Sequence, residues 1–217
     1  PILRGASGRR SRLCPRWSDK PGPTFAERLC RAGRGGNFRC MKVLVTGGIR
    51  CGKSLYAENL LADASAVTYV TPGYAADPSH DPEWAARVYN HQKRRPRHWT
   101  TIETLELAGE LSRETTTPLL IDCMTVWLTR QMDLAGIWDE RPGCDEALKA
   151  AVEEAVGAFA RATRPVVAVS NEVGQGLVPA EAGSRRFRDE MGVLNMRLAE
   201  VVDEVWFCTA GIPARLK

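Results

Sequence analysis

The chain has 217 residues, of which 44% are hydrophobic and 26% are charged, with a formal net charge of +4. This composition is that of one globular domain with a large core, and no apolar run reaches the roughly 20 residues of a membrane-spanning helix. The positive charge is uneven, because residues 1–40 hold ten basic and two acidic side chains, which leaves a mildly acidic remainder of 20 basic and 24 acidic ones.

Residues 1–40 are rich in Arg, Gly, Pro and Ser and show no sustained helical or strand period, which predicts a disordered extension. A nucleic-acid-binding arm is one interpretation of its basic charge. The other is a segment upstream of the natural start, because Met41 immediately precedes the first predicted strand. We favour the second and expect no nucleic-acid partner, since an Arg-rich tract alone is a weak motif.

From Met41 onward, apolar strand-like runs alternate with amphipathic helical stretches. The predicted strands are residues 42–46, 66–71, 118–123, 165–170 and 204–209. The predicted helices are residues 54–63, 82–94, 145–164 and 184–202, and the third carries its core face on Leu148, Val152, Val156 and Phe159. This alternation predicts a single α/β domain, residues 41–217, in which helices cover both faces of a mainly parallel sheet.

The seven cysteines are widely scattered, and none forms a C-x-x-C pair. An odd number in this arrangement predicts a cytoplasmic protein with reduced thiols and argues against a zinc site. We expect Cys123 and Cys208 to fill core positions in strands.

Residues 47–54 read G-G-I-R-C-G-K-S, the phosphate-loop pattern, with a predicted strand before it and a helix after it. The glycines let backbone N–H groups surround a phosphate at a helix N-terminus. Lys53 can reach the β- and γ-phosphates, and the Ser54 hydroxyl can ligate Mg²⁺. The pattern predicts a nucleoside triphosphate site formed by Gly47, Gly48, Ile49, Arg50, Cys51, Gly52, Lys53 and Ser54.

Two predicted strands end in polar residues. Asp122 ends an apolar run, at the sheet edge where ligands of parallel sheets gather, so we expect it to join Ser54 in holding Mg²⁺. A helix-capping role for Asp122 is the alternative. Residues 166–172 end in Ser-Asn-Glu before a loop with two glycines, which either approaches a bound molecule or is a plain connection.

The predicted helix 82–94 carries a histidine, His91, on one stripe with Trp84 and Val88. Three arginines lie within about one helical turn of it: Arg87, Arg94 and Arg95. We expect these cations to favour the neutral, nucleophilic imidazole and to neutralise the oxygens of an attacked phosphate. A structural histidine at the border of an apolar face is the alternative.

Six motifs follow one another in an order that is similar to one enzyme family. They are residues 47–54, Arg87-Val-x-x-His91-x-x-Arg94-Arg-Pro96, Leu120-Ile-Asp122-Cys123, Ser170-Asn-Glu-Val-Gly-x-Gly-x-Val-Pro179, Phe187-Arg-Asp189 and Ala210-Gly-Ile-Pro213. Through them, residues 41–217 resemble the bifunctional adenosylcobinamide kinase/adenosylcobinamide-phosphate guanylyltransferases of cobalamin biosynthesis. Residues 1–40 have no counterpart in that family, which fits a natural start at Met41.

The resemblance implies a RecA-like P-loop NTPase fold of three layers, assembled as a homotrimer. It implies that ATP or GTP phosphorylates adenosylcobinamide and that GMP then passes from GTP to that phosphate through a guanylyl-histidine intermediate on His91. The products would be adenosylcobinamide-GDP and pyrophosphate. The nucleotide contacts it implies are residues 47–54, Thr71, Pro72, Gly73, Gln92, Lys93, Arg94, Arg95, Glu103 and Asp122.

Three positions depart from the family's usual residues: Cys51, Met196 and residues 71–73. These departures affect the expected contacts with substrates, but they do not change the resemblance to the family. We place the corrinoid pocket near the loop 171–179, with Arg185 and Arg188.

Three other functions stay open: a small-molecule kinase without nucleotidyl transfer, a RecA-like nucleic-acid-dependent ATPase, and a non-catalytic nucleotide sensor. Covalent labelling of His91 discriminates the first, and deletion of residues 1–40 discriminates the second. The presence of Lys53, Ser54, His91 and Asp122 argues against the third.

Overall fold

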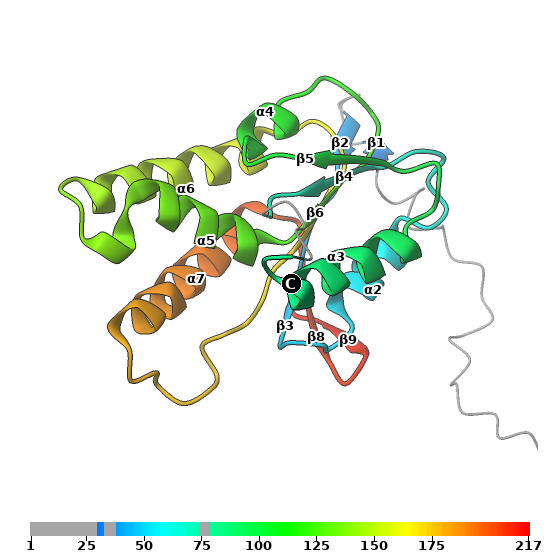
Figure 1. Ribbon diagram of the computed structural model, residues 1–217. Coiled ribbons are helices and arrows are strands. Elements are labelled where there is room, and N and C mark those ends of the chain that lie inside the picture. Colours follow the sequence, from blue (N-terminus) through cyan, green and yellow to red (C-terminus); the bar gives the residue numbers. More distant parts are fainter. Residues whose placement is uncertain (1–29, 33–37, 74–78) are drawn as a thin grey trace, which may run out of the picture.

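A computed structural model describes residues 30–32, 38–73 and 79–217 (Figure 1). A central sheet runs in the order β5-β4-β6-β7-β3-β8-β9. Its strands are β3 (Lys42–Gly47), β4 (Thr68–Thr71), β5 (Thr100–Glu103), β6 (Leu119–Asp122), β7 (Val166–Val169), β8 (Glu204–Thr209) and β9 (Ile212–Arg215). Neighbouring strands pair in parallel except β8 with β9. The predicted mainly parallel sheet is confirmed.

Helices cover both faces of this sheet (Figure 1). Helices α2 (Lys53–Leu60) and α3 (Pro82–Arg94) lie on one face, and α4 (Leu107–Leu111), α5 (Met124–Ala135), α6 (Cys144–Arg161) and α7 (Ala182–Val201) on the other. A short 3-10 helix, Ile137–Asp139, follows α5. Successive strand side chains point to opposite faces, so Val43 packs toward α2 while Leu44 packs toward the larger helical layer. The predicted three-layer fold is confirmed.

Several predicted details differ from the structure. Helix α2 ends at Leu60, not at residue 63. Helix α6 ends at Arg161, not at residue 164, because Arg164 precedes Pro165 and a residue before proline is driven out of the helical region. Cys123 follows β6 instead of lying within it and is half-buried, whereas Cys208 is buried in β8 as predicted. Elements β5, α4, α5 and β9 lie outside the predicted set.

Two short strands lie within the predicted disordered extension. β1 (Cys30–Ala32) and β2 (Phe38–Cys40) pair antiparallel as a separate sheet, which corrects the expectation of no strand there. Three-residue strands are too short to show a side-chain period. The rest of residues 1–37 lies outside the described part of the chain. Among the helices of that described part, none is long and apolar enough to cross a membrane.

Candidate active site

The phosphate loop leads from the carboxyl end of β3 into α2. Gly47 has a φ of +148°, and a Cβ built on it would lie 2.3 Å from the carbonyl oxygen of Cys208, so no side chain fits there. Lys53 begins α2 and is buried, and its Nζ donates to the carbonyl oxygen of Gly48 at 3.0 Å. The ammonium group therefore lies over the loop whose backbone would hold a phosphate.

Asp122 and Ser54 meet beside this loop, because the carboxyl ends of parallel strands share one edge of the sheet. The Ser54 hydroxyl donates to Asp122 Oδ1 at 3.3 Å. The N-cap of α5 is Cys123, and no side-chain capping hydrogen bond is formed. The Asp122 oxygens instead face Ser54, Tyr69 and His91, so the capping alternative is wrong. A hydroxyl and a carboxylate are oxygen donors that suit Mg²⁺, and the pair therefore fits the predicted cation.

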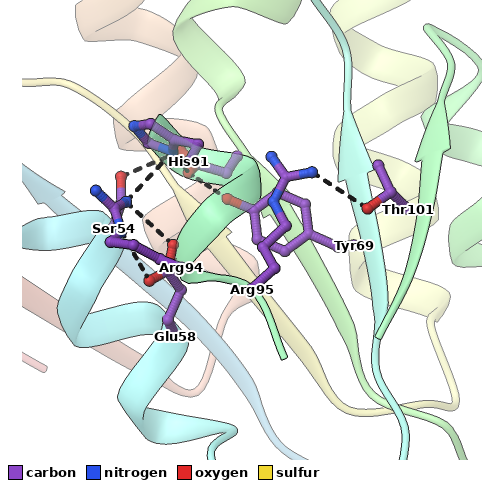
Figure 2. A network of polar contacts seen from close by, with 8 residues as sticks. Ser54, Glu58, Tyr69, His91, Arg94, Arg95 and Thr101 are labelled. Atoms are coloured by element: carbon purple, nitrogen blue, oxygen red, sulfur yellow. Dashed lines mark hydrogen bonds and ion pairs between the residues drawn. The ribbon is translucent and has the colours of Figure 1, made fainter. Parts of the chain in front are cut away.

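His91 approaches the same carboxylate from α3 (Figure 2). Asp81 caps this helix by accepting from the Trp84 backbone N–H at 2.8 Å, and Pro82 occupies its first turn. Two and a half turns later, His91 Nδ1 lies 3.2 Å from Asp122 Oδ2. The imidazole is about one-third exposed (34%), whereas the Asp122 side chain is 7% exposed. The histidine therefore borders the pocket while its partner is buried beneath it.

The protonation of Asp122 decides which nitrogen of His91 carries the proton. Burial raises the pKa of Asp122, but hydrogen bonds from His91 and Tyr69 outweigh it, and the pKa lies below its ordinary value. Asp122 is thus ionised and can only accept, so in the neutral imidazole His91 Nδ1 carries the proton toward it and Nε2 keeps the lone pair. That lone pair is what a nucleophilic histidine needs.

Only one of the three predicted arginines lies beside His91 among the side chains that the structure describes. Arg94 NH2 is 3.4 Å from His91 Nδ1 and also pairs with Glu58 of α2 at 3.2 Å. Arg95 turns away, because its guanidinium stacks 3.7 Å above the Tyr69 ring and donates to Thr101 at 3.2 Å. The side chain of Arg87 lies outside the described part. Of the two predicted arginines whose side chains the structure describes, Arg94 lies beside His91 and the expectation for Arg95 is corrected.

A pocket of about 630 Å³ joins these groups. Fourteen predicted site residues line it: Ile49, Arg50, Cys51, Gly52, Lys53, Ser54, Thr71, Gly73, His91, Gln92, Arg94, Arg95, Glu103 and Asp122. Four predicted residues do not: Gly47, Gly48, Pro72 and Lys93. Lys93 instead places its Nζ 4.5 Å over the ring of Tyr89. The motif residues thus converge on one cavity.

The pocket also has lining residues that were not predicted for the site: Leu55, Trp84, Val88, Asn90, Cys123, Val126 and Asn171. The helical stripe shared with His91 is a signal that points to Trp84 and Val88. The signal for Asn171 is the polar ending of residues 166–172, which was one of two interpretations of that segment. Its backbone and side-chain N–H groups donate to Thr125 Oγ1 at 3.1 and 2.9 Å.

The loop 171–179 is held by the two arginines that we associate with a corrinoid pocket. Arg188 donates to the carbonyl oxygens of Leu177 and Gly174 at 3.0 and 2.5 Å, and Arg185 donates to that of Pro179 at 3.0 Å. Leu177 at the tip is 97% exposed. Both guanidinium groups therefore shape this loop.

The fold and the site define a P-loop nucleotide-binding enzyme: a phosphate loop after a strand, a carboxylate at the end of another, and a three-layer arrangement around a parallel sheet. Residues 43–216 match the family described as cobinamide kinase/cobinamide phosphate guanyltransferase. The chain belongs to this family.

Curated relatives extend the match. The chain is 37% identical over 186 residues to the bifunctional adenosylcobalamin biosynthesis protein CobU of Escherichia coli, covering 82% of this chain and all of the relative. It is 39% identical over 181 residues to CobP of Pseudomonas aeruginosa, covering 82% and 98%. A solved type III secretion ATPase aligns with a TM-score of 0.49 and 12% identity over 78% of this chain and 51% of that one. So distant a likeness supports no conclusion here.

Proposed function

We propose that this protein phosphorylates adenosylcobinamide with ATP or GTP and then transfers GMP from GTP to the new phosphate, giving adenosylcobinamide-GDP and pyrophosphate. The observation that carries the proposal is the contact between His91 Nδ1 and Asp122 Oδ2 at 3.2 Å, inside the pocket that the phosphate loop lines. A small-molecule kinase needs the loop and the carboxylate but has no use for a histidine whose Nε2 is free. Family membership and the bifunctional relatives support both activities.

In the kinase reaction, the chain's contribution is positioning and charge. The phosphate-loop N–H groups and the Lys53 ammonium would hold the β- and γ-phosphates. Ser54 and Asp122 would hold Mg²⁺, which when bound neutralises negative charge on the phosphate oxygens. The corrinoid hydroxyl would attack the γ-phosphorus and form an O–P bond as the bond to the β–γ bridging oxygen breaks. ADP or GDP would leave, and the hydroxyl proton would pass to water.

In the transfer reaction, His91 Nε2 would attack the α-phosphorus of GTP, forming an N–P bond as the bond to the bridging oxygen breaks and pyrophosphate leaves. The imidazole becomes positively charged, and Asp122 Oδ2 stabilises it while the proton stays on Nδ1. A phosphate oxygen of adenosylcobinamide phosphate then attacks the same phosphorus, and the N–P electron pair returns to Nε2. Arg94 is placed to offset charge on the transferred group.

Several finer features belong to the same proposal. The working domain is residues 41–217, which acts in the cytoplasm as a homotrimer and binds no nucleic acid. The mild acidity of this segment and its family resemblance support these assignments. The corrinoid would lie beside the loop 171–179.

Product analysis tests the function. Purified full-length chain with adenosylcobinamide, Mg²⁺ and ATP should give adenosylcobinamide phosphate, and added GTP should convert it to adenosylcobinamide-GDP. A chain lacking residues 1–40 should do the same. Phosphorylation without conversion by GTP would reduce the protein to a kinase, and loss of both activities on deletion would contradict the domain assignment.

A further inference from the structure

Tyr69 is a buried residue outside the pocket that contacts the site's carboxylate. It lies on β4, is 0% exposed, and does not line the cavity. Its hydroxyl donates to Asp122 Oδ2 at 2.6 Å, the shortest of the three contacts that Ser54, His91 and Tyr69 make with this carboxylate. Figure 2 shows the Tyr69 hydroxyl pointing toward His91, with Arg95 over the ring. A short hydrogen bond to a buried carboxylate fixes the orientation of that carboxylate.

The orientation matters because the two oxygens of Asp122 serve different groups. Oδ1 accepts from Ser54 at 3.3 Å, and Oδ2 accepts from Tyr69 and faces His91 Nδ1. A carboxylate that rotates part-way about its Cβ–Cγ bond moves both oxygens out of line with these partners. The Tyr69 hydroxyl opposes this rotation, because it would lose its hydrogen bond of 2.6 Å to Oδ2.

The Tyr69 ring is itself held in place from two sides. The Arg95 guanidinium lies 3.7 Å above the ring, and the ring of Trp99 lies 6.1 Å away, centroid to centroid. Burial raises the pKa of the Tyr69 hydroxyl, and the charge of Asp122 raises it further. The phenol therefore stays protonated and remains a donor throughout the working pH range.

We propose that Tyr69 is a positioning residue for guanylyl transfer. Tyr69 acts through Asp122, which in turn holds His91 with its Nε2 toward the α-phosphorus. This rests on the proposed function and names a residue that neither the phosphate loop nor the histidine motif includes. The proton of His91 stays on Nδ1 during N–P bond formation and cleavage, so Tyr69 transfers no proton and makes no contact with GTP. Its loss should slow the covalent step and leave nucleotide affinity unchanged.

The test compares Tyr69→Phe with wild type in the full-length chain. The rate constant for incorporation of GMP from GTP labelled at the α-phosphate is measured against GTP concentration, and adenosylcobinamide-dependent formation of ADP from ATP is measured in parallel. Phenylalanine keeps the ring and removes only the hydroxyl. Because the lost bond joins a donor to a charged group, labelling should slow about tenfold or more. The half-saturating GTP concentration should stay within about twofold, because Tyr69 lies outside the pocket. The kinase rate should fall less than the labelling rate, because the kinase step uses Asp122 but not His91.

Val70→Ala is the matched control, because Val70 is the next residue of β4, is equally buried, and packs on the opposite face of the sheet. It should lower the free energy of unfolding without slowing the labelling of folded protein. Labelling of Tyr69→Phe at the wild-type rate, or an equal fall in labelling and kinase rates, would overturn the positioning role while the proposed function stands. Absence of labelling in wild type would instead refute the proposed function, and the positioning role with it.

Discussion

Gly47 lies directly against the backbone of Cys208, where a Cβ on the glycine would be 2.3 Å from the cysteine carbonyl oxygen. The two residues are partners in the register of the parallel strands β3 and β8. The same built Cβ would lie 2.8 Å from Cys51 Sγ. The first glycine of the phosphate loop is therefore required by strand packing as well as by the loop's own conformation.

Gly47→Ala should destabilise the protein by about 2 kcal/mol or more, because backbone atoms must move and φ is positive. The measurement is the free energy of unfolding in urea. Gly192→Ala is the control, since Gly192 is an exposed position inside α7 and a Cβ there meets nothing within 4 Å. That control should gain about 0.5–1 kcal/mol from helix propensity. Equal effects of the two substitutions would contradict the packing argument.

The sequence predicts those parts of the site whose geometry follows from local pattern. Strand, loop and helix around residues 47–54 follow from motif and context, and the position of Asp122 follows from the shared edge of parallel strands. The contact between Asp122 and His91 could not be derived, because it depends on how α3 packs against the sheet. Tyr69 could not be found either, since in sequence it is an ordinary strand aromatic. Arg95 was expected beside His91, but stacking on Tyr69 draws it away.

The ion pair between Glu58 and Arg94 joins α2, which follows the phosphate loop, to α3, which carries His91. The Glu58 side chain is 9% exposed, so removing its partner leaves a buried carboxylate uncompensated. Arg94→Met should therefore cost more stability than the double variant Glu58→Gln/Arg94→Met, by roughly 1 kcal/mol given the partial exposure of Arg94. The free energies of unfolding in urea of wild type, Arg94→Met, Glu58→Gln and the double variant together form a double-mutant cycle. If Arg94→Met is as stable as the double variant, or more stable, the Glu58–Arg94 ion pair does not couple the two helices.

Arg164 holds together the end of the sheet opposite the site. It is 1% exposed, and its guanidinium donates to the carbonyl oxygens of Thr117 and Glu110 at 2.8 and 3.3 Å and to Thr68 Oγ1 at 2.9 Å. Arg164→Met leaves these acceptors without their donors and should cost about 3 kcal/mol or more.

Arg164→Lys should recover little of this stability, because an ammonium cannot reproduce the geometry of the guanidinium. Thermal unfolding measures both losses. Labelling by GTP well below the unfolding temperature should match wild type, since the site lies at the other end of the strands. Recovery of full stability by lysine would show that charge alone matters at this position.

Because of the Cys208 thiol, the free energy of unfolding should fall as the pH rises above about 9. Burial raises the pKa of Cys208 from 9.0 to about 11, and Cys51 adds to the effect. Between these values the unfolded chain loses the thiol proton and the folded chain keeps it, so this stabilisation is complete below pH 9 and is lost as the pH rises toward 11.

Wild type should therefore lose about 1 kcal/mol more than Cys208→Ala between pH 8 and pH 10. Urea unfolding at both pH values gives the difference, and any cavity left by the substitution cancels because it acts at each pH. The pH dependence of wild type, measured in the same buffers, is the reference. If the free energy of unfolding of Cys208→Ala falls with pH as much as that of wild type, the Cys208 thiol does not titrate as inferred.

The central claim is that His91 takes GMP from GTP in the pocket of the phosphate loop. Its most direct measurement is incubation with GTP labelled at the α- or at the γ-phosphate, followed by denaturation and mapping of the label. Label from the α-position alone should be found on His91, stable in alkali and released by acid as expected of an N–P bond, and His91→Asn should remain unlabelled. Label from the γ-position, or equal labelling of wild type and His91→Asn, would contradict the account.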